Sequence, residues 1–142
     1  MKKKILFLCT GNSCRSQMAE GWCRHLWNEQ YECYSAGTRK HGLNERAVKV
    51  MAEVGLDISN HFSKALEDLP NVPFNFVVTV CGAAKETCPY FPAEKIIHLG
   101  FEDPPAITKD LTNETEIMEV YRKVRDEIYD SIKKLPTLFG EQ

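Results

Sequence analysis

One stretch near the start of the chain decides how the rest is interpreted: Cys9-Thr10-Gly11-Asn12-Ser13-Cys14-Arg15-Ser16. The apolar run at 5–8 precedes it and a helical pattern follows it, so it is predicted to be a strand-to-helix turn. Such a turn points successive backbone N–H groups, together with the positive end of the helix dipole, at one spot. The residues after Cys9, 10–16, are therefore predicted to form a cradle for an oxyanion.

The residue types inside this stretch suit a tetrahedral oxyanion. Gly11 lets the backbone approach a ligand closely, and Asn12 tolerates the left-handed conformation that a tight nest of amides needs. The guanidinium of Arg15 offers a planar fork of donors. Cys9 lies at the mouth, where these groups favour the thiolate, and Ser16 can donate a hydrogen bond to its sulfur. The stretch therefore predicts a nucleophilic cysteine rather than an inert residue at the end of a buried strand.

Length and composition indicate a globular protein. We expect the 142 residues to form one domain, 1–142, with hydrophobic and charged fractions of 43% and 27%. The net charge of −2 gives no reason to expect nucleic acid or a membrane surface as partner, and no apolar run approaches the ~20 residues of a membrane span. Because no signal-peptide core follows the first lysines, we expect a cytoplasmic protein, and we expect a monomer.

Six cysteines are many for such a chain: Cys9, Cys14, Cys23, Cys33, Cys81 and Cys88. The size of the expected core and the missing signal favour reduced thiols with a catalytic or redox use over a disulfide framework. No spacing typical of a zinc site occurs, so no metal is predicted. Cys23 and Cys33 are interpreted as core residues.

Strand and helix patterns alternate along the chain. Strands are predicted over 3–8, 31–36, 74–80 and 95–99. Helices are predicted from Ser16 to about Asn28, after a cap at Asn44, over 63–69, and after a cap at Thr112. The buried face of the second helix is expected to hold Ala47, Val48, Met51 and Val54, and the stripe of the last to run from Ile117 to Leu135. This alternation predicts an α/β fold in three layers, α/β/α, around a four-stranded parallel sheet.

Three notable side chains follow predicted strands: Cys9, Cys81 and Asp103. In open α/β sheets the site lies at the carboxyl ends of the strands, so these residues are expected to share one crevice. Asp103 precedes two prolines in a rigid turn over 100–105, where its carboxylic acid can protonate a leaving oxygen, although an ordinary Asp-Pro turn explains it equally well. Cys81 and Cys88 lie seven apart across a loop and can form a disulfide if the loop rearranges, or can be two buried thiols.

The chain resembles the thioredoxin-coupled arsenate reductases that use the low-molecular-weight protein tyrosine phosphatase fold. The matching segments cover nearly the whole chain: residues 9–16, Ser-Ala-Gly-Thr at 35–38, Asp-Ile-Ser-Asn-His at 57–61, Val-Cys-Gly at 80–82, Cys-Pro at 88–89 and Gly-Phe-Glu-Asp-Pro at 100–104. The cradle motif is shared with the phosphatases, and the pair Cys81 and Cys88 separates the reductases from them.

The resemblance implies a relay of three cysteines. Cys9 attacks arsenate with Asp103 as acid, Cys81 attacks Cys9 and releases arsenite, and Cys88 then takes the disulfide to Cys81, where thioredoxin reduces it. No flavin, nicotinamide or other cofactor is implied. Some members are thought to bind a monovalent cation near residues such as Asn12 and Glu20; here an ammonium at Lys64 can take that role, so a metal is not predicted.

Two other functions stay open. A phosphohydrolase would use Cys9, Arg15 and Asp103 on phosphoesters, with the other cysteines incidental, although Pro105-Ala106 stands where phosphatases usually carry tyrosines. A third possibility is an oxyanion-binding or redox-sensing module without turnover. Cys14 is given no role in turnover.

Overall fold

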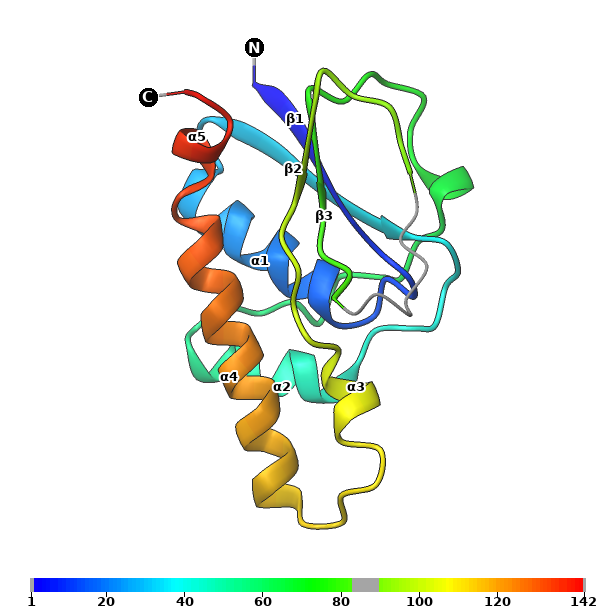
Figure 1. Ribbon diagram of the computed structural model, residues 1–142, viewed down its shortest axis with the longest axis vertical. Coiled ribbons are helices and arrows are strands. Elements are labelled where there is room, and N and C mark those ends of the chain that lie inside the picture. The colour runs from blue at the N-terminus through cyan, green and yellow to red at the C-terminus, as the bar shows by residue number, and fades with distance from the viewer. Residues whose placement is uncertain (1, 83–89, 142) are drawn as a thin grey trace.

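The computed structural model describes residues 2–82 and 90–141, in which one parallel sheet organises the fold (Figure 1). Its strands are β1 (Lys3–Cys9), β2 (Tyr31–Gly37), β3 (Phe76–Thr79) and β4 (Lys95–His98). They are hydrogen-bonded in the order β2-β1-β3-β4, and all three pairs are parallel. The prediction of a four-stranded parallel sheet is confirmed, and the carboxyl ends of all strands meet at one edge.

The described residues also form five α-helices. They are α1 (Arg15–Trp27), α2 (Glu45–Glu53), α3 (Pro104–Ile107), α4 (Glu114–Ile132) and α5 (Leu135–Leu138), with a short 3-10 helix at Leu66–Asp68. Helix α1 packs against β2, β1 and α4, and α2 packs against α4 (Figure 1). The long helices therefore share one face of the sheet, and α1 starts directly beside the end of β1.

The two faces of β1 enter different clusters of apolar residues. Ile5 and Phe7 belong to the apolar cluster that also contains Met18 and Ile128 from the helices, whereas Leu6 belongs with Phe74 to the cluster on the opposite face. This period of two is what a central strand requires. The opposite face is covered by partly buried residues around the 3-10 helix and near 91–93, so the second outer layer is built mostly from extended chain.

The helix predicted over 63–69 is wrong in its first part. Residues 63–64 belong to no helix or strand, Ala65 forms a parallel bridge with Gly37, and only Leu66–Asp68 makes a 3-10 turn. The backbone N–H of Gly37 donates to the carbonyl of Lys64 at 2.9 Å. The backbone of this segment is therefore hydrogen-bonded to the end of β2. In a helix the same carbonyl would accept from an N–H within the segment instead.

Three details of the other helices also differ from the predictions. The cap of α4 is Asn113 rather than Thr112, because the Asn113 side chain accepts from the N–H of Glu116 at 3.1 Å. Leu135 is buried as predicted but lies in α5, whose second residue is a proline that cannot continue α4. Val54 directly follows α2 and is 38% exposed, whereas Val50 within α2 is fully buried.

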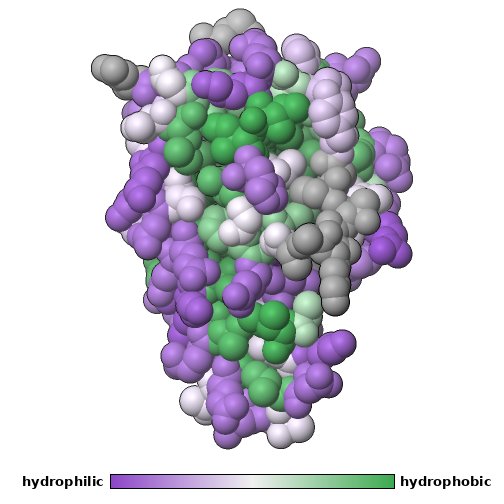
Figure 2. Space-filling model, in the orientation of Figure 1, coloured by the Kyte–Doolittle hydropathy of each residue, from purple (hydrophilic) through white to green (hydrophobic). Residues whose placement is uncertain are grey.

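The two ends of the described chain lie close together at the amino ends of the strands (Figure 1). The carboxylate of Glu141 accepts from the Tyr31 hydroxyl at 2.7 Å and pairs with Lys3. Polar residues cover most of the face in Figure 2, with apolar surface gathered in a few areas. No helix in the described part of the chain is both long enough and apolar enough to span a bilayer.

Candidate active site

The cradle predicted from the sequence lies between β1 and α1. Asn12 has φ of 48°, and it is the sole non-glycine residue with positive φ among those described, which confirms the predicted left-handed conformation. A Cβ on Gly37 would lie 2.6 Å from the carbonyl oxygen of Thr10 and 2.8 Å from the nitrogen of Asn12. The end of β2 therefore packs directly on the cradle backbone, and only glycine fits there.

A neighbouring segment holds the outer side of the cradle. The N–H groups of Arg39, His41 and Asn44 donate to the carbonyls of Thr10, Gly11 and Ser13, each at 3.0 Å. These three bonds satisfy cradle carbonyls from outside. The cradle is thus fixed as a preformed structure before any ligand binds.

Cys9 is buried, and its sulfur lies within 2.9 Å of the Ser16 hydroxyl oxygen. This is the contact expected from the sequence. Ser16 Oγ also accepts from Asn12 Nδ2 at 2.8 Å. The hydroxyl is therefore placed to donate its own hydrogen to the sulfur, which favours the thiolate.

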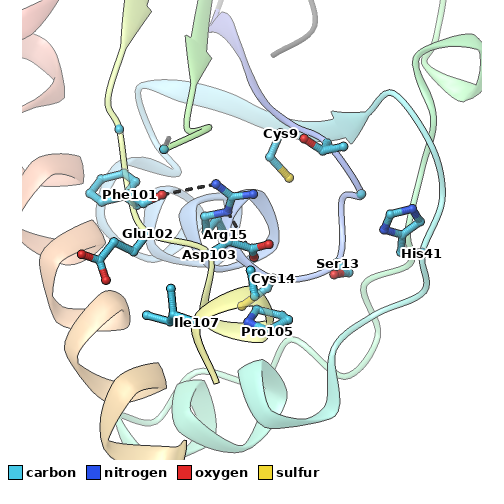
Figure 3. A pocket seen from close by; sticks show the side chains of 15 residues that line it. Cys9, Ser13, Cys14, Arg15, His41, Phe101, Glu102, Asp103, Pro105 and Ile107 are labelled. Carbon is cyan, nitrogen blue, oxygen red and sulfur yellow. Dashed lines mark hydrogen bonds and ion pairs between the residues drawn. The ribbon is translucent and has the colours of Figure 1, made fainter. Parts of the chain in front are cut away.

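Arg15 connects the start of α1 with the ends of two other strands. It is 3% exposed, and its Nη1 donates to the carbonyl oxygen of Phe101 at 3.2 Å and of Val80 at 3.4 Å (Figure 3). Its Nε lies 3.5 Å from Oδ1 of Asp103. The guanidinium is thus fixed by backbone groups on one side and a carboxylate on the other.

Asp103 stands at the start of α3 with an extended backbone, φ of −89° and ψ of 105°. The segment 100–105 is not simply the rigid turn that was predicted, because a helical turn starts at Pro104. A proline at the first helical position has the φ that a helix needs and lacks only an N–H that would be unpaired there. The Asp103 side chain is 36% exposed, so it can exchange protons with solvent.

Cys9, Arg15 and Asp103 line one cavity of about 720 Å³ (Figure 3). Thr10, Gly11, Ser13 and His41 form one wall; Gly100, Phe101, Glu102, Asp103, Pro105, Ala106 and Ile107 form another. Cys14 also lines it, whereas Asn12 and Ser16 are fully buried behind the cradle. These two residues are not among those that line the cavity, and the oxyanion-binding role predicted for them stays a prediction.

Cys81, the second cysteine of the predicted relay, lies two residues after the end of β3. Cys81 is 2% exposed and disulfide-bonded, whereas Cys9, Cys14, Cys23 and Cys33 are free thiols. A Cβ on Gly82 would lie 2.3 Å from the carbonyl oxygen of Phe101, so the turn after Cys81 packs tightly on the rim of the cavity. Cys88 lies outside the described residues, and its role stays a prediction.

Cys14 lines the cavity, but its thiol is not activated. Burial raises its pKa well above the ordinary value, and the negative charges of Asp103 and Cys9 raise it further, against the lowering effect of Arg15. The pKa of Cys23 is raised as well, by burial first and then by a hydrogen bond to Cys33. Both thiols stay protonated near neutral pH, which agrees with the interpretation that they take no part in turnover.

The residues near Glu20 do not fit an added monovalent cation. Glu20 is 3% exposed; its carboxylate accepts from Ser35 Oγ at 2.5 Å and pairs with Arg24 at 2.9 Å, while Lys64 Nζ lies 4.0 Å away. The positive charges of Arg24 and Lys64 therefore lie close enough to offset the charge of this carboxylate, which is the role suggested above for the ammonium group of Lys64. The described residues contain no group of three or more His, Cys, Asp or Glu side chains arranged to hold a metal.

Sequence reasoning missed three side chains near the site. Gln17 is fully buried and contacts Asn12; His61 contacts Gln17; His41 lies on the cavity wall over Gly11. Gln17 shares its helix face with Glu20 and Arg24, so its position in the sequence gave no sign that it is buried. Nothing in the pattern around His41 distinguished it from a loop residue.

Comparison with known proteins agrees with this geometry. The family described as low molecular weight phosphotyrosine protein phosphatase matches residues 4–142. The arsenate reductase of Oceanobacillus iheyensis is 51% identical over 134 residues, which cover 93% of this chain and 94% of that protein.

Two solved structures extend the comparison. One is described as an arsenate reductase in the phosphate binding state, with a TM-score of 0.77, 29% identity and coverage of 96% of this chain and 98% of the other. The second is a low molecular weight protein tyrosine phosphatase from T. tengcongensis, with a TM-score of 0.70, 29% identity and coverage of 96% and 99%. The chain therefore belongs to the low molecular weight phosphotyrosine protein phosphatase family and is similar, within it, to proteins named arsenate reductases.

Proposed function

We propose that this protein reduces arsenate to arsenite by means of a cysteine relay that thioredoxin regenerates. The observation that carries the proposal is the meeting of Cys9, Arg15 and Asp103 in one cavity above a preformed amide cradle. The relatives named arsenate reductases, about half identical to this chain, support the choice of arsenate over other oxyanions.

In the first step arsenate binds in the cradle with its oxygens toward the backbone N–H groups and Arg15. The Cys9 thiolate, held by Ser16, attacks arsenic while Asp103 gives a proton to the oxygen that leaves as water. The Asp103 carboxyl group lies 3.5 Å from Arg15 Nε, which keeps it beside the bound oxyanion, and it acts in its protonated form in this step. The product is an arsenic–sulfur bond to Cys9, with arsenic still pentavalent.

The second step moves electrons. The Cys81 thiolate attacks the sulfur of Cys9, so a disulfide forms while the arsenic–sulfur bond breaks. The electron pair of that bond stays on arsenic, which leaves as arsenite. Cys88 then attacks Cys81 and frees Cys9, and a dithiol of the thioredoxin class reduces the Cys81–Cys88 disulfide. Two electrons thus pass from the thioredoxin dithiol to arsenic, and the scheme needs no further cofactor.

The remaining expectations about the working state belong to the same proposal. We infer one domain over residues 1–142, a monomer, and action in the cytoplasm. Reducing conditions there keep Cys9 and Cys81 available as thiols between turnovers.

The test is a single turnover without reductant. The reduced protein is mixed with arsenate, arsenite is measured, and the disulfide is located by peptide mapping. We expect one arsenite per molecule for the wild type and for Cys88→Ser, which should stop with Cys9 joined to Cys81. Cys81→Ser should release none, because no thiol is placed to attack Cys9. Sustained turnover by Cys88→Ser with thioredoxin as sole reductant would contradict the relay.

Phosphoester hydrolysis is a second candidate, favoured by the size of the cavity. Its volume of about 720 Å³ and the apolar side chains of Pro105, Ala106 and Ile107 leave room for an organic substituent beyond the oxyanion. Hydrolysis needs only Cys9, Arg15, Asp103 and water. Fast turnover of an aryl phosphate that survives Cys81→Ser, with no arsenite released by the wild type, would favour this function.

A further inference from the structure

His41 lines the cavity beside the cradle, and the cysteine relay does not use it. Its ring lies over Gly11, and with Thr10 and Ser13 it forms the cradle side of the cavity (Figure 3). We propose that His41 is a further substrate-binding residue, which donates a hydrogen bond to the oxygen that points out of the cradle. This contact selects a bare tetrahedral oxyanion over an ester or an organic derivative at the same site.

The backbone fixes the position of His41. Its N–H donates to the carbonyl of Gly11 at 3.0 Å, and the N–H of Arg39 donates to that of Thr10 at the same distance. A Cβ on Gly11 would lie 2.3 Å from Nδ1 of His41 and 2.8 Å from its Cγ, so the ring occupies space that glycine leaves free. The imidazole is therefore held against the cradle, although the residue is exposed to solvent.

The ring nitrogens of His41 are available to a ligand. In the part of the chain that the structure describes, neither nitrogen takes part in a hydrogen bond or an ion pair, in contrast to the rings of His61 and His98. An imidazole carries one N–H group in each neutral tautomer and two when it is charged. A donor that meets only water in the free protein can bind an oxyanion without breaking a bond within the protein.

The other N–H donor among the described side chains of the cavity wall is already shared. Arg15 directs Nη1 to two backbone carbonyls, and its Nε lies 3.5 Å from Asp103. Glu102 adds a second carboxylate to the same wall, and Cys9 reacts as an anion. A dianionic ligand therefore enters a cavity with several negative groups, and His41 supplies a donor that offsets them.

The direction of attack sends one oxygen of the ligand out into the cavity. The sulfur of Cys9 must attack opposite the oxygen that leaves, as in other in-line displacements. Three oxygens of a tetrahedral anion then face the backbone N–H groups, and the fourth points away from Cys9. Asp103 approaches this outer oxygen from the rim, and His41 lies on the other wall (Figure 3). The outer oxygen thus lies between a proton donor and a hydrogen-bond donor.

The outer position is therefore a point of selection between ligands. In arsenate and phosphate the outer oxygen has no substituent and can accept from His41. In a phosphonate a carbon atom takes its place, and in an ester the oxygen carries an organic group and accepts more weakly. His41 acts in this way only if an oxyanion binds above Cys9, and this is the part of the proposed function on which its role rests.

Phosphate and methylphosphonate are the two probes, because a methyl group replaces one oxygen in the second. Each is titrated for its protection of Cys9 against iodoacetamide, with peptide mapping as readout, at a pH where both ions carry two charges. His41→Leu should weaken phosphate about tenfold, the value of one hydrogen bond to a charged group, and should leave methylphosphonate within about twofold. Equal weakening of both ions, or of neither, would overturn the proposal.

Two amide variants test whether the N–H donor itself is what matters. His41→Asn and His41→Gln place an amide near the positions of Nδ1 and Nε2, and one of them should hold phosphate within about threefold of the wild type. A loss as large as that of His41→Leu in both would contradict the proposal. His25→Leu, at an exposed position on α1 outside the cavity, is the matched control and should bind both ions as the wild type does.

Arsenite release by the wild type is measured beside these titrations, so that the role of His41 and the proposed function can fail separately. The expected pattern of protection without any arsenite would leave the role of His41 standing and remove the proposed reduction. Normal arsenite release with equal weakening of both ions would do the opposite. Thermal melting of each variant confirms that the protein under test is folded.

Discussion

The two sides of the cavity are built in different ways. The cradle side is buried and heavily bonded: Asn12, Ser16 and Gln17 have no exposed surface. The rim formed by residues 100–107 is open by comparison, with Asp103 at 36% and Ile107 at 45% exposure. The difference indicates that nucleophile and oxyanion need a fixed geometry, whereas the acid needs access to solvent and the rim must stay reachable.

The largest effect should come from the residue that joins both sides. Arg15→Lys keeps the charge but loses the bonds to Phe101 and Val80 and the planar fork toward the oxyanion. We expect kcat/KM to fall about 10³-fold, in line with the loss of an oxyanion donor. Steady-state arsenite release measures it. Arg122→Lys, at a half-buried arginine on α4 that pairs with Glu53 away from the cavity, is the control, and equal turnover in both variants would show that the fork is not used.

On the rim, Asp103→Asn removes the acid and keeps the shape. Turnover should fall about 10²-fold, the usual share of a general acid. Stability should change by less than about 1 kcal/mol, because the ion pair with Arg15 is partly exposed. Turnover and thermal melting are measured together, with Asp110→Asn as control. A large loss of stability would mean that the rim is as tightly built as the cradle.

Two glycine substitutions, one beside the cradle and one on the rim, test whether the cradle is more tightly packed than the rim. Gly37→Ala places a Cβ against cradle backbone at 2.6 Å and should lower the free energy of unfolding by about 2 kcal/mol, the range of overpacked sites. Gly100→Ala on the rim meets the His98 ring at 3.3 Å, and a side chain can move aside. Its effect should be clearly smaller. Urea unfolding of both variants gives the comparison, and equal losses would remove the distinction.

The smallest effect is expected inside the cradle itself, at Cys14. Its raised pKa keeps it a thiol near neutral pH, and only the thiolate reacts quickly. Iodoacetamide should therefore modify Cys9 and spare Cys14, with phosphate protecting Cys9. Cys14→Ala should keep turnover within about threefold, since only packing changes. Modification of Cys14 at the rate of Cys9 would contradict this.

The sequence predicted the elements whose apolar residues follow a regular period. The strand runs, the α1 face and the left-handed Asn12 all follow from periodicity or from one residue's conformational range. The helix predicted over 63–69 was wrong because hydrogen bonds to distant residues decide the structure of this segment. The Lys64 carbonyl accepts from the N–H of Gly37, and the Lys64 N–H donates to Asn12 Oδ1. No local sequence pattern predicts these bonds.

The same reason explains what was missed in the site. The cradle residues are contiguous, so their spacing could be read directly, and Asp103 was found by its place after a strand. The support behind them joins Gln17 to His61 across 44 positions. Such a contact depends on how α1 meets the segment that follows α2, which local patterns in a single sequence do not record.

The pairing of Glu141 with Lys3 and Tyr31 has a practical consequence. Both ends of the described chain emerge at the amino ends of the strands (Figure 1). The residues that line the cavity follow the carboxyl ends of the strands. An affinity tag, a fluorophore or a tether to a solid support attached at either end would therefore project away from the cavity. In an immobilised form of this protein, the opening of the cavity should stay accessible to small anions and to macromolecules. Such a form is suited to sensors and capture columns.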